Sequence, residues 1–132
     1  MDNTRVRLAK ELAAARAKEN EYISRPGIAY SRGASNLDAG IADRRNFAVR
    51  WRKAALELPG TLTMRKVKVV SRFENEHYSF TVLSSDGVDQ FAVELTAGPN
   101  FIYRWVQMEA GETAEEALKR DGFKIEGGQN DH

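Results

Sequence analysis

The sequence predicts an α+β fold with two N-terminal helices, a four-stranded antiparallel meander, and a short C-terminal helix with a possible fifth edge strand. Three observations predict it. Apolar residues recur at helical spacing before Pro59, they alternate with polar residues after Gly60, and a capping signature begins at Thr113. The chain has 132 residues, so we expect a single domain over residues 1–126 and a flexible tail over 127–132.

The first helix is predicted over residues 4–24, with a stop at the following Pro-Gly pair. Its apolar stripe is narrow, and the candidate apolar contacts on it are Leu8, Leu12 and Tyr22. The stripe covers only about two and a half heptads, fewer than a coiled coil usually needs. This helix therefore fits either a shallow groove of its own domain or a helix of another chain.

A loop rich in Ser, Gly and Arg is predicted over residues 25–40. Loops of this length within a compact domain are uncommon and are typically functional or disordered. Arg25, Tyr30 and Arg32 are candidate loop contacts for an anion, because Gly33 lets backbone N–H groups approach such a ligand. A mobile linker is the alternative.

The second helix is predicted over residues 37–58. Arg44 lies in the middle of its apolar face, and Arg45 and Arg52 flank that face. An arginine in this position must extend to solvent, pair with a carboxylate, or meet an anionic ligand.

The antiparallel sheet is predicted over residues 61–108. In its first strand, one face carries Lys66, Lys68 and Arg72, and the other carries Val67, Val69 and Phe73. Asp86-Gly87 is a strong signal for a two-residue hairpin.

The fourth strand of the meander is apolar on both faces. Tyr103 and Trp105 share one of them and are candidate apolar contacts. These rings either fill a core or form an open stacking platform of the kind that binds single-stranded nucleic acid.

The C-terminal helix is predicted over residues 114–121. Thr113 and Glu116 form a capping box, and Gly122 suits the position after the helix. Residues 123–125 then provide the possible edge strand.

Charge is unevenly distributed, although the formal net charge is only +1. Residues 1–72 carry 16 Lys and Arg against 7 Asp and Glu, whereas residues 73–132 carry 4 against 12. We expect part of this split to cancel within the chain, with Arg72 near Glu74 and Glu76. The basic candidates for anion or nucleic-acid contact are Arg44, Arg45, Arg52, Lys66 and Lys68. The acidic counterpart is the C-terminal helix with Glu112, Glu115 and Glu116.

The catalytic inventory is thin, and the sequence predicts no cofactor and no metal site. His77 with Glu74 and Glu76 is either an acid–base or metal cluster or, more simply, an exposed turn. The chain lacks cysteine and any run of about 18 apolar residues, so we expect no membrane association and a cytoplasmic location.

These observations favour a non-catalytic binding or assembly protein that contacts a protein partner or a second copy of itself through basic and acidic surfaces. Small domains of this kind are frequent among phage and mobile-element accessory proteins, such as inhibitors, which gives a class-level expectation only. The alternative is a nucleic-acid-binding module that uses the basic helix and strand. A third possibility is a small enzyme with an anion pocket formed by Arg44 and the preceding loop.

Overall fold

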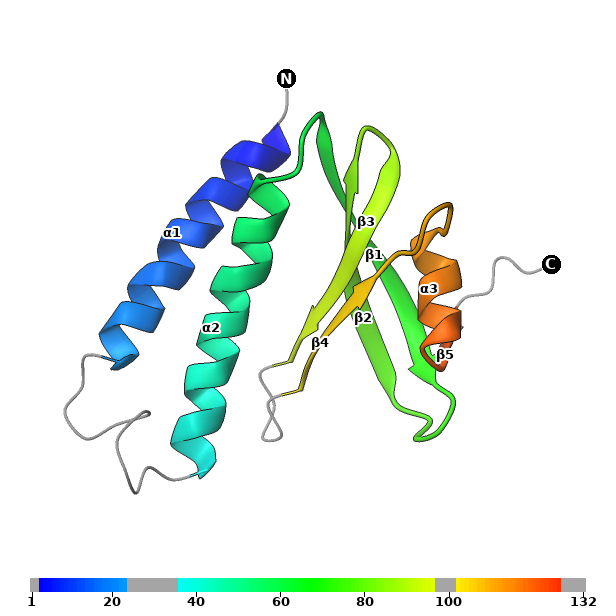
Figure 1. The fold of residues 1–132 in the computed structure, drawn as a ribbon. Coiled ribbons are helices and arrows are strands. Elements are labelled where there is room, and N and C mark those ends of the chain that lie inside the picture. The colour runs from blue at the N-terminus through cyan, green and yellow to red at the C-terminus, as the bar shows by residue number, and fades with distance from the viewer. Residues whose placement is uncertain (1–2, 24–35, 97–101, 127–132) are drawn as a thin grey trace. The chain divides into compact units, whose positions relative to one another are not determined.

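The computed structural model describes residues 3–23, 36–96 and 102–126, with the backbone alone for 22–23 and 36–40. In chain order, the elements are α1 (Asn3–Ile23), α2 (Asn36–Leu56), β1 (Leu62–Ser71), β2 (His77–Ser85), β3 (Val88–Leu95), β4 (Tyr103–Gln107), α3 (Ala114–Arg120) and β5 (Phe123–Ile125) (Figure 1). The predicted α+β fold is confirmed, and so is the fifth strand.

The segment between the first two helices is shorter than the predicted loop. The predicted loop over 25–40 and the predicted helix over 37–58 share residues 37–40. Because α2 begins at Asn36, residues 36–40 are helical. Residues 24–35, which include the loop candidates Arg25, Tyr30 and Arg32, lie outside the described residues, and so does the predicted tail.

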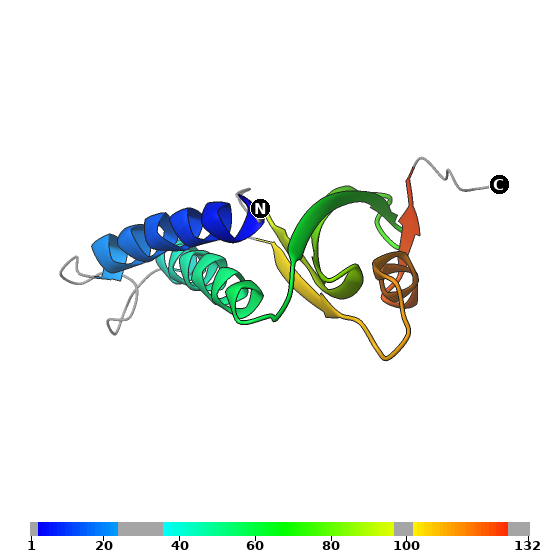
Figure 2. The same ribbon diagram turned by 90° about the horizontal axis from the view of Figure 1, so that it is seen from above.

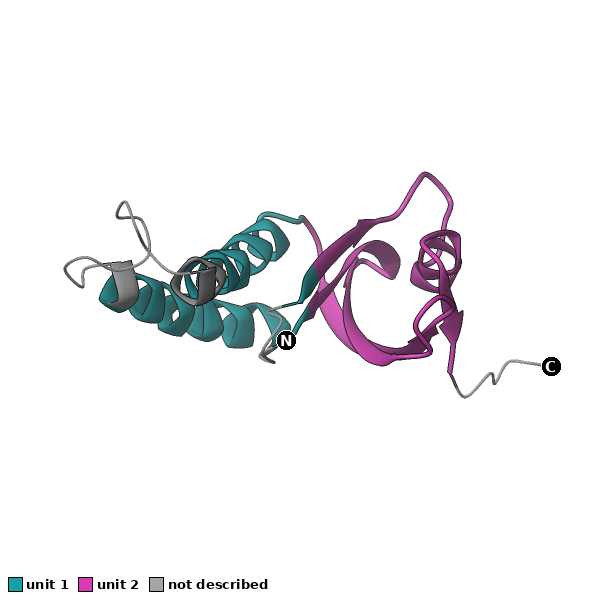
Figure 3. Cartoon of the chain, turned by 90° about the horizontal axis from the view of Figure 1, so that it is seen from below, with its two compact units in different colours: residues 1–58, 95–103 teal, residues 59–94, 104–132 magenta. Residues whose placement is uncertain are grey.

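The chain divides into two compact units (Figure 3). Unit 1 comprises Met1–Leu58 and Leu95–Tyr103, and unit 2 comprises Pro59–Glu94 and Arg104–His132. A single domain over 1–126 stays a prediction.

In unit 1, α1 and α2 lie side by side and antiparallel (Figures 1 and 2). Polar pairs follow this arrangement along the two helices: the Arg52 Nε lies 3.1 Å from Glu11 Oε1, and the Asn46 amide donates to Glu19 at 2.9 Å. The Arg5 guanidinium donates to the carbonyls of Leu56 and Leu58, where a cation also complements the C-terminal end of α2.

Unit 2 contains the antiparallel sheet, in the order β4-β3-β2-β1-β5. The meander turns between β2 and β3 at Asp86 and Gly87, which have φ angles of 50° and 83°. Positive φ at both positions is typical of the predicted two-residue hairpin, and it explains the Asp-Gly sequence. The last strand then returns to pair with β1, with Ser71 opposite Phe123.

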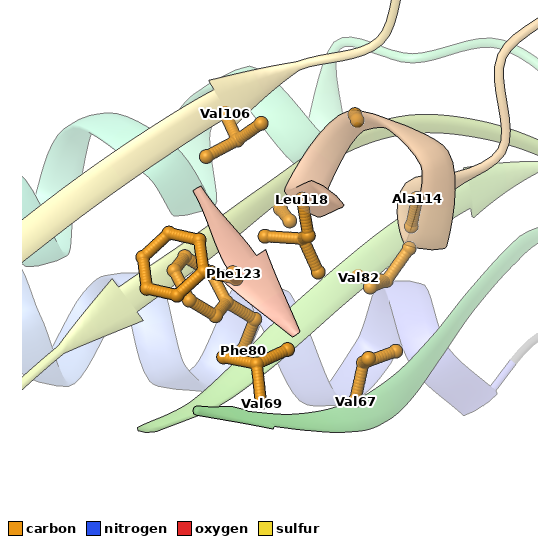
Figure 4. Packing of buried hydrophobic residues seen from close by; sticks show 10 residues of the cluster. Val67, Val69, Phe80, Val82, Val106, Ala114, Leu118 and Phe123 are labelled. Carbon is orange, nitrogen blue, oxygen red and sulfur yellow. The ribbon is translucent and has the colours of Figure 1, made fainter. Parts of the chain in front are cut away.

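The core of unit 2 lies between the sheet and α3 (Figure 4). Val67 and Val69 of β1 point into it, together with Leu118 of α3. Val106 from one edge strand and Phe123 from the other also join this core, so the sheet curls around α3. Burial of these side chains supplies the main stabilisation of the unit.

The capping box at the start of α3 is confirmed. The Glu116 N–H donates to Thr113 Oγ1 at 3.2 Å, and the Thr113 N–H donates to Glu116 Oε1 at 2.9 Å. These two bonds satisfy N–H groups that the helix itself leaves without an acceptor.

The prediction that Phe73 shares the strand face of Val67 and Val69 is wrong: those valines are buried, whereas Phe73 is 87% exposed. The strand β1 ends at Ser71, and the chain turns over residues 72–74. The alternation of side chains that buries Val67 and Val69 therefore stops before it reaches Phe73.

Candidate functional site

Four exposed cations lie on the face of β1 and β5 that points away from α3. Lys66 and Lys68 alternate with the core residues of β1, which places them on the opposite face. Lys124 of β5 pairs with Val70 and so shares that face. Arg72, the first residue after β1, lines the same hollow as Val70 and Lys124. We call this set the cationic strand face: Lys66, Lys68, Arg72 and Lys124.

The cationic strand face is not neutralised by carboxylates of the described residues. None of its four side chains forms an ion pair there. Lys66 Nζ instead donates to the hydroxyl of Thr81 at 2.7 Å. Glu126, which follows β5, lies 3.2 Å from His77 Nδ1. Glu126 also donates its N–H to the Lys68 carbonyl at 2.8 Å, so one carboxylate lies beside the four cations, which have no ion pair in the described part of the chain.

A hollow of about 360 Å³ lies at one end of this face. Its lining comprises Val70, Ser71, Arg72, Asn75 and Lys124. Two cations and the side-chain amide of Asn75 thus converge on one surface depression, which is the donor chemistry that an anionic oxygen requires.

Arg65 lies on the other face of β1, and there the charge is fully engaged. Its guanidinium makes two bonds to the Asp89 carboxylate, at 2.8 and 3.2 Å, and a third to Glu115 at 2.8 Å. Asp89 also accepts the Ser84 hydroxyl at 2.6 Å and the Ala114 N–H at 2.7 Å. Arg65 is therefore a structural residue that fastens α3 to the sheet.

This network sets the ionisation of Asp89. Burial alone would raise the pKa of its carboxyl group, but the hydrogen bonds from Arg65, Ser84 and the Ala114 N–H outweigh burial and lower that pKa. The hydrogen bonds of Arg65 to Asp89 and Glu115 raise the pKa of its guanidinium, against the effect of burial. Asp89 is thus held as a carboxylate inside unit 2.

The three helical candidates lie in unit 1, in or beside a groove between α1 and α2. A groove of about 300 Å³ has a floor of alanines and a rim with Arg45, Arg52 and Lys18. An adjoining hollow of about 280 Å³ adds Arg44. Periodicity within α2 alone does not indicate Lys18, since α1 supplies it.

Arg52 is largely committed within this helix pair. It bonds Glu11 as described above, donates to the Ala48 carbonyl at 3.0 Å, and stacks 4.4 Å from the Trp51 ring centre. Its side chain is only 20% exposed. The basic candidates thus fall into two sets, with Arg44, Arg45 and Arg52 in unit 1 and Lys66 and Lys68 in unit 2. One continuous basic surface stays a prediction.

The acidic helix is engaged within its own unit. Glu112 binds Arg120 at 3.0 Å, Glu115 binds Arg65, and Glu116 completes the capping box. The hydrogen bond from Arg120 lowers the pKa of Glu112. The expected cancellation of charge therefore occurs here, whereas Arg72 forms no ion pair with Glu74 or Glu76 in the described part of the chain.

The apolar candidates have different surroundings. Leu8 and Leu12 are buried. The Trp105 ring stacks on Phe91 with 4.7 Å between ring centres, and Tyr103, which is 36% exposed, packs 5.1 Å from Phe47. The side chain of Tyr22 lies outside the described residues.

Two other possibilities have no support within the described residues. No group of three or more His, Cys, Asp or Glu there is placed to hold a metal ion, so the turn with His77 is not such a site. The loop half of the predicted anion pocket is not described.

Among the described helices, none is long and apolar enough to cross a bilayer. No protein-family model, curated protein or solved structure matches the chain.

Proposed function

We propose that this chain is a non-catalytic binding protein that holds the phosphate backbone of a nucleic acid on its cationic strand face. One observation carries the proposal: four exposed cations share a face, and none has an ion pair among the described residues. In the same unit, Arg65 and Arg120 both have carboxylate partners. An external anion is the partner chemistry that the four cations fit.

The spacing of these cations favours a polymer over a small ion. Lys66 and Lys68 are two residues apart on a strand, about 7 Å, and the row from Lys66 to Arg72 extends over about 20 Å. Like charges held this close repel one another, and a row of phosphates relieves that repulsion along its whole length. The hydroxyl of Thr81 lies in the same row and is a further donor for phosphate oxygen.

The net charge of unit 2 limits the expected affinity for a nucleic acid. Unit 2 carries 8 Lys and Arg against 12 Asp and Glu, whereas unit 1 carries 12 against 7. The attraction to the cationic strand face therefore acts at short range. We expect sequence-independent binding that weakens steeply with salt.

Assembly through complementary basic and acidic surfaces has less support than binding of a nucleic acid. Its acidic half, Glu112, Glu115 and Glu116, is engaged inside unit 2. An acidic protein that binds the cationic strand face remains the competing partner, and the test below separates it from nucleic acid. A cytoplasmic location stays a prediction.

The test is fluorescence anisotropy at low salt with labelled single-stranded and duplex DNA of random sequence. We expect binding by the native chain and a loss of about tenfold or more in the variant with Lys66→Gln and Lys68→Gln together. Lys119→Gln is the control for the loss of one positive charge and is compared with Lys66→Gln alone, because Lys119 is an exposed lysine of unit 2 on α3, away from the cationic strand face. It should leave affinity nearly unchanged.

Two results overturn the proposal. One is the absence of binding to either DNA at low salt. The other is an equal loss of affinity in Lys66→Gln and in the Lys119→Gln control, which would show that net charge and not this face is responsible. Displacement of bound DNA by polyglutamate at matched charge concentration would instead favour an acidic protein as the partner.

A further inference from the structure

Resting on the proposed function, we infer that Phe73 stacks on an unpaired base, so that this surface takes single-stranded nucleic acid in preference to duplex. The proposal concerns the exposed ring at the tip between β1 and β2, beside the hollow that Arg72 and Lys124 line.

The exposure of Phe73 is unusual for a residue of this kind. It is 87% exposed, although a phenylalanine ring is among the side chains that proteins most often bury. Of the other exposed large apolar side chains in the described residues, Val6 and Val88 have no π-face and Tyr103 is only 36% exposed. An apolar ring left in solvent is a characteristic of a contact residue.

The backbone at Phe73 is anchored, and one edge of the ring touches the chain. One edge lies against Gly122, where an added Cβ atom would come within 2.9 Å of the Phe73 ring. The Phe73 N–H donates to Ser71 Oγ at 3.3 Å, and the preceding Arg72 N–H is bonded to the Gly122 carbonyl. These contacts set where the ring leaves the turn, and its faces remain open to a base.

Charge complementarity identifies the occupant. Arg72 directly precedes Phe73, and Gly122, which the ring touches, lies two residues before Lys124. Arg72 and Phe73 thus lie in the turn that contacts the start of β5, which carries Lys124. Cations together with an aromatic ring are the combination that binds single strands. The bases of a duplex are already paired and stacked, so a duplex offers phosphates to the cations but no free base to the ring.

Two glutamates follow Phe73 in the turn, and neither forms an ion pair with Arg72 in the described part of the chain. Glu74 follows Phe73 in the turn, and its carboxylate accepts a hydrogen bond from the Tyr78 hydroxyl at 3.3 Å. That bond directs Glu74 toward β2. Glu76 is exposed farther along the turn, and its carbonyl accepts the Ser71 N–H at 2.8 Å.

The experiment compares affinity for single-stranded oligothymidine and for duplex DNA in the native chain, Phe73→Leu and Phe73→Tyr. Leucine keeps an apolar side chain without a π-face, whereas tyrosine keeps the ring. We expect Phe73→Leu to lose about five- to tenfold in affinity for the single strand and to keep its affinity for duplex. Phe73→Tyr should retain the native preference.

The outcomes separate this inference from the proposed function. If the native chain binds neither DNA, the proposed function fails and the role of Phe73 fails with it. If it binds both and Phe73→Leu changes neither affinity, only the stacking role is overturned. Equal losses for single strand and duplex in Phe73→Leu would also overturn it, because an anchor that ignores base pairing is not stacking on a base.

Discussion

The two faces of β1 carry cations with different environments. Arg65 points toward α3 and is bound by Asp89 and Glu115, whereas Lys66, the next residue, points away and bonds only a threonine hydroxyl. The backbone alternation alone separates them. Neighbouring charges in a sequence can therefore belong to entirely different parts of a protein, one structural and one available to a partner.

This comparison also shows how little a count of charges says about a binding surface. The C-terminal helix and the turn before it carry three glutamates, yet each has a partner in its own unit. The cationic strand face lies on a unit with more acidic than basic residues. What distinguishes this face is that four cations without an ion pair among the described residues lie together on it.

The largest expected effect is on stability and comes from the face of β1 that points toward α3. Asp89→Ala removes the acceptor of Arg65, Ser84 and the Ala114 N–H. It leaves the last two donors partly buried without that acceptor, and Arg65 keeps its bond to Glu115. We expect the free energy of unfolding to fall by about 2–4 kcal/mol, measured by urea denaturation. Glu115→Ala, at the exposed end of the same network, should cost less than about 1 kcal/mol. Equal effects of the two substitutions would contradict the structural role of Asp89.

The same carboxylate makes stability depend on acid. Because the pKa of Asp89 is lower in the folded chain than the ordinary value of about 3.9, its contribution is fully present above about pH 4 and is lost as the pH falls through the folded pKa. Denaturation at a series of pH values should therefore show a decline below about pH 4. Asp89→Asn should make that decline shallower, and an unchanged slope would exclude Asp89 as its source.

A smaller effect on stability is expected from the cap of α3, the helix that covers this face of β1. Thr113→Ala removes the hydroxyl that accepts the Glu116 N–H, at a cost of about 1 kcal/mol. Thr113→Ser keeps that hydroxyl and should retain most of the native stability. Thermal unfolding of both variants checks the difference. If serine destabilises as much as alanine, the lost contribution is the methyl group and not the cap.

The smallest expected effect on stability comes from the cationic strand face. Lys66→Gln with Lys68→Gln removes no ion pair, so the free energy of unfolding should change by less than about 0.5 kcal/mol. At low salt the change should be stabilising, because a repulsion between like charges is relieved. A loss above 1 kcal/mol would show that these lysines have a structural role after all.

Local sequence signals predicted much of the fold. The Thr113–Glu116 capping box and the Asp86-Gly87 turn are short, and each is governed by backbone chemistry within a few residues. The alternation of Lys66, Val67 and Lys68 gave the two faces of β1 correctly. It failed at Phe73, because the pattern does not indicate where the strand stops.

The missed residues of the candidate site depend on pairings between distant segments. Lys124 joins Arg72 only because β5 pairs with β1. Lys18 joins Arg45 only because α1 and α2 lie antiparallel. The sequence does not distinguish Arg65 from the other basic residues, because its partner Asp89 comes 24 residues later. No local pattern identifies these neighbours.

The most direct test of the central claim is the salt dependence of binding to single-stranded DNA. Four phosphate contacts predict that the logarithm of the association constant falls with the logarithm of salt concentration with a slope of about −3. The variant with Lys66→Gln and Lys68→Gln should have a slope shallower by about 1.4, and Lys119→Gln should match the native chain. Identical slopes in all three proteins would contradict the assignment of the cationic strand face as the binding surface.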